Sequence, residues 1–113
     1  MSAAPNPALQ ARLQELRSRF EHTLPERLAA IAVRLGQLSL EPTRGDWLAE
    51  LTRDFHSMAG TAGSFGLVEV SAITLAAEEV CNRVDGRIDD QALDALMALI
   101  SRATDVTRRA LPA

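Results

Sequence analysis

The stretch LPERLAAIAVRLGQL, residues 24–38, decides the fold of this chain. Its apolar side chains recur in steps of four and three, at Leu24, Leu28, Ile31, Leu35 and Leu38. Such steps keep side chains on one face of a helix that has 3.6 residues per turn. Similar spacing runs through most of the 113 residues, and no segment alternates apolar and polar residues as a strand does. The sequence therefore predicts an all-α protein.

Helix boundaries follow from these stripes and from the residues between them. A stripe through residues 9–20 predicts a short first helix over about 7–21. Pro25 lacks a backbone N–H, so we expect it to separate this helix from a second one over about 24–38. Three more helices are expected: one from the Thr43 start signal to Gly66, one over 70–84, and one from Asp89 to about 110.

The links between the last four of these helices are only a few residues long. Short links force neighbouring helices to run antiparallel, which predicts an up-down-up-down four-helix bundle with an additional short N-terminal helix at one end. A length of 113 residues suits one domain. We therefore expect residues 1–113 to form a single domain, with a flexible leader over about 1–6.

Composition excludes several classes of function. The net charge is −3, and the twelve basic residues, all arginine, are spread along the chain. A nucleic-acid-binding protein usually carries a basic stripe and a net positive charge, so we expect no nucleic-acid partner. No apolar run approaches the roughly eighteen residues that span a bilayer, so we expect no membrane contact. Cys81 is the only cysteine, which excludes an intrachain disulfide and favours a reducing, cytoplasmic location.

The stretch FHSMAGTAGSFG, residues 55–66, is poorly suited to a purely structural helix. Gly60 and Gly63 lie inside the periodic segment, where each glycine costs about 1 kcal/mol relative to alanine. They follow His56 by four and seven residues and so share its face. Phe55 belongs to the apolar stripe, which places His56 at the edge between core and solvent.

An imidazole at such an edge is a candidate nucleophile. Its ordinary pKa is about 6.5, so near neutral pH it is mostly uncharged and one ring nitrogen is free to react. The candidate surface around His56 consists of small and polar residues: Thr52, Arg53, Ser57, Ala59, Gly60 and Gly63. Small residues either leave the ring open to an incoming protein or allow another helix to pack closely, and the sequence leaves both interpretations open.

This stretch resembles the core motif of the histidine phosphotransfer (HPt) family, H-x-L-K-G followed by small residues and a second glycine. The corresponding residues here are His56-Ser57-Met58-Ala59-Gly60, continuing to Gly66. Residues 24–28 are similar to the L-P-E-R-L of the family, and Leu75-Ala76 with Glu78 is similar to its downstream L-A…E region. The resemblance covers nearly the whole chain.

The resemblance implies that His56 carries a phosphoryl group, through Nε2, between receiver-domain aspartates of a two-component phosphorelay. It implies a receiver domain and/or a hybrid sensor histidine kinase as partner, and a monomeric phosphoryl carrier rather than an enzyme. The Mg²⁺ ion and the acidic cluster that catalyse transfer would belong to the partner. We therefore expect neither a cofactor nor a metal site in this chain.

One departure concerns the lysine of the motif, which is Ala59 in this chain. Arg53, one turn before His56, is a candidate to replace its charge, although it could equally be a solvated arginine paired with Glu50 or Asp54. The missing lysine also favours an alternative function, an HPt-like regulator that binds a kinase or receiver domain without accepting phosphate.

Two rival interpretations are weaker. The phosphoacceptor domain of a histidine kinase typically has an acidic residue after the histidine and a proline five residues on, where this chain has Ser57 and Thr61. A metal site made of His22, His56 and Cys81 would need three helices to converge. We interpret His22 as a surface residue and Cys81 as a buried thiol. Glu78 is either a solvated helix charge, which we favour, or part of the partner surface.

Overall fold

The computed structural model describes residues 6–110, which form four α-helices and no strand. They are α1 (Pro7–Leu40), α2 (Gly45–Ser64), α3 (Val68–Asn82) and α4 (Asp90–Ala110). The predicted all-α class is confirmed. Residues 1–5 of the expected leader lie outside the described part of the chain, and Asn6 caps α1 by accepting a hydrogen bond from the Ala8 N–H.

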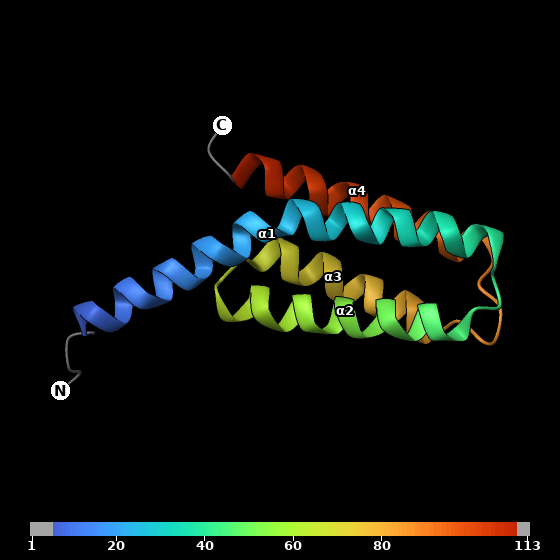
Figure 1. Ribbon diagram of the computed structural model, residues 1–113, viewed down its shortest axis with the longest axis horizontal. Helices are drawn as coiled ribbons and strands as arrows, with labels where there is room; N and C mark the ends of the chain where they lie inside the picture. The colour runs from blue at the N-terminus through green and yellow to red at the C-terminus, as the bar shows by residue number, and fades with distance from the viewer. Residues whose placement is uncertain (1–5, 111–113) are drawn as a thin grey trace.

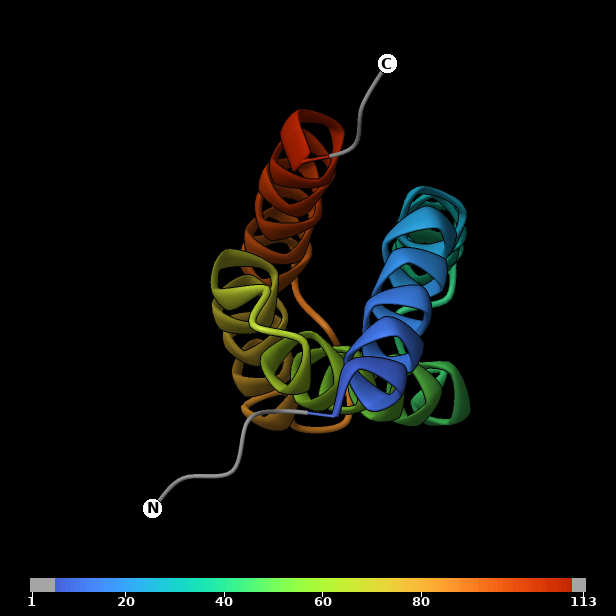
Figure 2. The same cartoon turned by 90° about the vertical axis from the view of Figure 1, so that its left-hand side faces the viewer.

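The four helices lie along a common long axis, and the chain reverses direction at each of the three connections (Figure 1). Viewed from the end, the helices surround a shared centre (Figure 2). α2 packs extensively on α3, α3 on α4, and α4 on α1, whereas α1 and α2 are the least closely packed of the neighbouring pairs. The pair α2–α3 is therefore the most closely joined part of the molecule.

The expected division of the N-terminal region into two helices is wrong, because α1 is continuous from Pro7 to Leu40. Pro25 lies inside it and offers no N–H to the carbonyl of Glu21, one turn earlier. The helix continues because Phe20, Leu24 and Leu28 form one stripe across the proline and all three are buried. The proline bends α1 rather than ending it, and the change of direction is visible in Figure 1.

The first part of α1 projects beyond the bundle (Figure 1). Leu9 is 58% exposed and Leu13 is 49% exposed, although both belong to the apolar stripe. The first buried member is Phe20, whose ring centroid lies 5.8 Å from that of Phe65. We call residues 7–19 the overhang.

A tight turn joins α2 to α3. Gly66 has φ +76°, a backbone conformation that residues with a Cβ rarely adopt. The N–H of Leu67 donates to the carbonyl of Ala62 at 2.8 Å, and the N–H of Gly66 donates to that of Gly63 at 3.1 Å. These bonds satisfy the last carbonyls of α2 and direct α3 back along it.

The opposite end of the bundle is held by Trp47 of α2. Two guanidinium groups lie over its ring, that of Arg44 at 3.8 Å and that of Arg34 at 5.0 Å from the ring centroid. Arg34 comes from α1, so this stacking joins the neighbouring helices that are otherwise least closely packed. None of the helices described over residues 6–110 is both long and apolar enough to cross a membrane.

Candidate functional site

His56 lies on the solvent edge of α2. Its side chain is 79% exposed, whereas Phe55 before it and Met58 after it are completely buried. The two buried neighbours fix the rotation of the helix, and this rotation holds the imidazole outside the core.

A carboxylate from the next helix holds one nitrogen of this ring. The Nδ1 atom of His56 lies 2.7 Å from Oε2 of Glu78, which belongs to α3. A carboxylate this close to Nδ1 favours a hydrogen on that nitrogen, and in the neutral ring Nε2 then keeps its lone pair. The exposed ring therefore offers Nε2 as a nucleophile without help from a separate base.

Glu78 itself is largely covered, with 14% of its side chain exposed. Our interpretation of Glu78 as a solvated helix charge was therefore wrong. Burial raises the pKa of the nearby Cys81 thiol, and the negative charge of Glu78 adds a smaller increase. The sequence similarity at Leu75-Ala76 and Glu78 was the available signal, but it did not reveal the contact with His56.

The small residues near His56 divide into two groups. Ala59 is buried, and its carbonyl accepts a hydrogen bond from Oγ of Ser71 at 2.9 Å. A Cβ on Gly63 would lie 3.3 Å from the same Oγ, so Ala59 and Gly63 allow α3 to approach closely. Gly60 is exposed, and a Cβ there would meet nothing within 4 Å. Ala59 and Gly63 therefore fit the interpretation that another helix packs closely, and Gly60 fits the interpretation that the surface beside the ring is open.

The polar candidates also differ in their surroundings. The hydroxyl of Thr52 donates to the carbonyl of Leu48 at 2.8 Å, so it is bonded within its own helix. Ser57 and Arg53 are exposed. Within the described residues Arg53 forms no salt bridge, and the acidic side chain of Glu50 lies 3.8 Å from Arg34 instead. Arg53 is therefore a cation available one turn from His56.

Exposed apolar side chains lie along α3 in the turns that precede Glu78. Leu75 lies one turn before Glu78, and Val68 lies two turns before Leu75 on the same side of the helix. Both are exposed. We call the surface formed by these α3 residues and the open positions of α2 the α2–α3 face; it comprises His56, Gly60, Gly63, Val68, Leu75 and Glu78.

The residues considered for a metal site do not converge. Over residues 6–110, no group of three or more His, Cys, Asp or Glu side chains could hold an ion. His22 is an exposed residue of α1, and its Nδ1 lies 2.7 Å from the carbonyl of Ser18. Cys81 is buried in α3. Of the two histidines, His56 has a carboxylate beside Nδ1, whereas His22 has only a backbone carbonyl of its own helix there.

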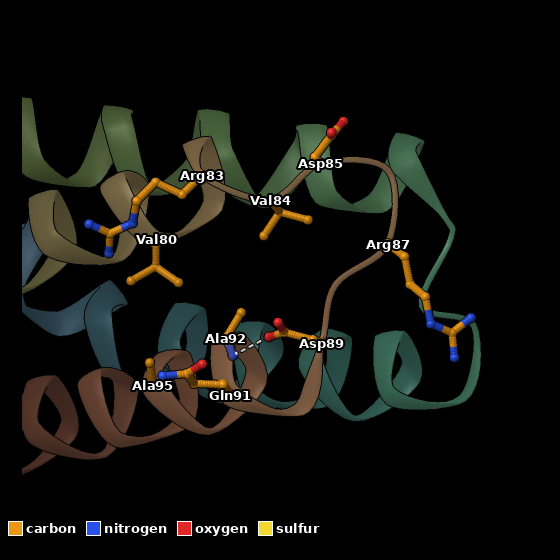
Figure 3. A pocket seen from close by; sticks show the side chains of 9 residues that line it. All are labelled: Val80, Arg83, Val84, Asp85, Arg87, Asp89, Gln91, Ala92 and Ala95. Atoms are coloured by element: carbon orange, nitrogen blue, oxygen red, sulfur yellow. Dashed lines mark hydrogen bonds between the residues drawn. The ribbon is translucent and has the colours of Figure 1, made fainter.

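A hollow of about 550 Å³ lies away from His56, between the end of α3 and the start of α4 (Figure 3). Val80, Val84 and Ala92 line it, and Asp89 accepts a hydrogen bond from the Ala92 N–H at 2.8 Å. The Asp85 and Arg87 side chains point away from the hollow (Figure 3). Of its polar lining residues, Asp89 is therefore engaged in capping the start of α4.

The Hpt domain family model matches residues 15–106, which include every helix at least in part and both His56 and Glu78. The chain therefore belongs to the Hpt domain family. Hpt domains have a phosphotransfer role in two-component signalling; they are phosphocarriers rather than kinases and interact with receiver domains and histidine kinases. Neither the curated proteins nor the solved structures include a significant match to this chain.

Proposed function

We propose that residues 1–113 act as a single phosphotransfer domain that carries a phosphoryl group on Nε2 of His56 between receiver-domain aspartates. The observation that carries this proposal is the 2.7 Å contact between Nδ1 of His56 and Glu78, beside a ring that is otherwise exposed. The scaffold is an up-down-up-down antiparallel four-helix bundle, in which α2 and α3 hold the ring and its carboxylate.

Phosphoryl acceptance is a direct displacement at phosphorus. The lone pair of Nε2 forms the new N–P bond, the P–O bond to the receiver aspartate breaks, and the aspartate leaves as a carboxylate. The ring keeps its hydrogen on Nδ1 and becomes a phosphorylated imidazolium. The Glu78 carboxylate stabilises this positive charge, and reversal of the same steps delivers the phosphoryl group to the next aspartate.

The phosphoryl oxygens also need positive charge. Ala59 occupies the position of the family's lysine and provides none, so we propose that the exposed guanidinium of Arg53 pairs with these oxygens. The Mg²⁺ ion belongs to the receiver in this proposal, and the carrier needs no cofactor of its own. The α2–α3 face receives the partner, because Leu75 and Val68 supply apolar surface and Gly60 leaves space beside the ring.

We further propose that the protein acts as a cytoplasmic monomer without kinase activity, and that its partners are a receiver domain and/or a hybrid sensor histidine kinase. An isolated exposed ring with its own positioning carboxylate needs no second subunit to complete it. Sedimentation velocity tests the monomer; a dimer that persists at micromolar concentration would contradict this part of the proposal.

The test of the carrier uses two phosphoryl sources. We expect phosphoramidate and a phosphorylated receiver to label wild type at Nε2 of His56, as read by ³¹P NMR and mass spectrometry, and His56→Gln to remain unlabelled at this position. Glu78→Gln should slow acceptance by about tenfold because the positioning charge is lost. Glu79→Gln, at the adjacent exposed position, is the matched control and should leave the rate unchanged.

A structural role for Glu78 predicts a different pattern. Positioning through Nδ1 predicts that Glu78→Ala shifts the ring toward the tautomer protonated at Nε2, which ¹⁵N NMR detects, whereas a merely structural role would leave the tautomer unchanged. Arg53→Ala should slow transfer in both directions, and unchanged kinetics would exclude Arg53 as the phosphoryl partner.

The substitution of Ala59 for lysine specifically favours a second candidate, a regulator that binds a kinase or receiver without accepting phosphate. The same assays decide between the two functions. Receiver binding without any His56 label, tested across the organism's full set of receiver domains, would support the regulator and contradict the carrier.

A further inference from the structure

The apolar stripe of the overhang has no partner among the described residues. Leu9 and Leu13 are about half exposed, and Leu16 is only partly covered. The family match begins at residue 15, so Leu9 and Leu13 lie outside the part of the chain that the Hpt model describes. These leucines therefore need an explanation separate from the phosphotransfer site.

The pattern of the stripe is that of a helix-pairing seam. Leu9, Leu13, Leu16 and Phe20 are spaced by four, three and four residues, which corresponds to alternating d and a positions of a heptad. Leucines at only these positions form a narrow stripe, whereas a helix that lies on a membrane surface presents a broad apolar face. The overhang is thus shaped to pair with one other helix.

Arginines flank this seam. Arg12, Arg17 and Arg19 occupy the e and g positions beside the leucines, and Gln10 occupies the remaining one. Glu15 lies 3.1 Å from Arg12 and 2.7 Å from Arg19, which holds both guanidinium groups along the helix. Arg12 and Arg19 remain more than half exposed and so available to a partner, whereas Arg17 lies 2.7 Å from Glu21 and is 40% exposed.

This charge pattern argues against a second copy of the chain as the partner. In a pair of helices the flanking positions of one seam face those of the other, so two overhangs would place arginine against arginine. Within residues 7–19, three arginines and one glutamate give +2, which leaves −5 for the rest of a chain of net charge −3. That acidic remainder also opposes binding to an anionic membrane.

We propose that the overhang docks an amphipathic helix of a partner protein, whose leucine-like stripe is flanked by aspartate or glutamate. The docked helix covers Leu9, Leu13 and Leu16, and its carboxylates pair with the flanking arginines. The overhang joins the bundle beside the α2–α3 turn, through the Phe20–Phe65 contact. A partner tethered there is held near the α2–α3 face at a raised local concentration.

The test is an NMR titration of the ¹⁵N-labelled full chain with two synthetic peptides. Both are three-heptad helices with leucine at a and d; one has glutamate at e and g, and the matched peptide has lysine there. We expect the acidic peptide to shift amides of residues 8–20 and to bind about tenfold more tightly than the basic one.

Variants make the assignment specific. Leu13→Gln should weaken binding of the acidic peptide by about tenfold, since a seam leucine is lost. Met97→Gln, a similarly exposed apolar residue on α4, is the matched control and should change nothing. Combined replacement of Arg12, Arg17 and Arg19 by glutamate should reverse the preference toward the basic peptide.

Several outcomes would overturn the proposal. Equal binding of the two peptides, or amide shifts confined to residues outside the overhang, would contradict docking of an acidic partner helix. A Leu13-dependent dimer in sedimentation velocity would assign the seam to a second copy, and Leu13-dependent pelleting with phosphatidylcholine–phosphatidylserine vesicles would assign it to a membrane. Labelling of His56 by phosphoramidate does not depend on the overhang. A chain that is labelled but binds no acidic peptide would therefore contradict the docking proposal alone, and a chain that is not labelled would contradict the carrier function.

Discussion

Gly60 and Gly63 lie on the same side of α2 and differ in what surrounds them. The space beside Gly60 is open, whereas Gly63 faces the hydroxyl of Ser71, which is itself bonded to the carbonyl of Ala59. The first glycine leaves room above the surface, and the second leaves room for the neighbouring helix. Substitution by alanine separates these two uses.

We expect Gly60→Ala to raise the free energy of unfolding by about 1 kcal/mol, because alanine favours a helix interior and nothing blocks its methyl group. Gly63→Ala should gain less or lose stability, since its Cβ would lie 3.3 Å from Oγ of Ser71. Urea unfolding followed by circular dichroism measures both. Equal gains would mean that Ser71 moves aside without cost.

Cys81 provides a pH prediction. Burial raises the pKa of its thiol above the ordinary value of 9.0, so the folded state favours the neutral form. The stability that this preference contributes is fully present below the pKa of the thiol in the unfolded chain. It is lost as the pH rises from there toward the higher pKa of the thiol in the folded protein. The stability difference between wild type and Cys81→Ala should therefore shrink between about pH 8 and about pH 10. A constant difference would contradict a buried thiol.

At the scale of helices, the apolar stripes were sufficient to place α2, α3 and α4 nearly as observed. They could not decide whether Pro25 divides α1, because this depends on whether Phe20 and Leu24 are buried together across the proline. The site was predictable in part. The exposed position of His56 follows from its place beside the apolar stripe. Its contact with Glu78, 22 positions later, depends on how α3 is aligned along α2, which the stripes do not determine.

Hydrogen exchange along α1 should be uneven. Amides between about residues 10 and 19 have only local helical bonds to protect them, whereas residues 28–38 are packed against the core. We expect protection to rise sharply after Phe20. Exchange measured by NMR tests this, and uniform protection from residue 10 onward would show that the overhang is held by contacts not described above.

Removal of residues 1–14 should leave the free energy of unfolding within about 0.5 kcal/mol of wild type, since the leucines it removes are exposed. The shortened chain begins at residue 15, where the family match also begins, and it retains every buried residue of α1. Urea unfolding of the shortened chain provides the measurement. A loss greater than about 1 kcal/mol would indicate that the overhang stabilises the bundle.

At the scale of the whole molecule, one core joins all four helices, and neighbouring residues of α2 belong to opposite environments. Phe55→Ala removes a completely buried ring and should cost about 3–5 kcal/mol. His56→Gln alters an exposed side chain and its contact with Glu78 and should cost less than about 1 kcal/mol. Urea unfolding of the two variants tests the contrast; similar losses would contradict the rotation of α2 described above.

The stacking of two guanidinium groups over Trp47 has a practical consequence for solution studies. Trp47 is the only tryptophan, so its fluorescence arises from one known place between α1 and α2. It lies nine residues before His56, roughly 13 Å along the helix axis. We expect its emission to change when the helices separate and to remain steady when a protein covers His56. One natural chromophore therefore distinguishes loss of structure from partner engagement without any added dye.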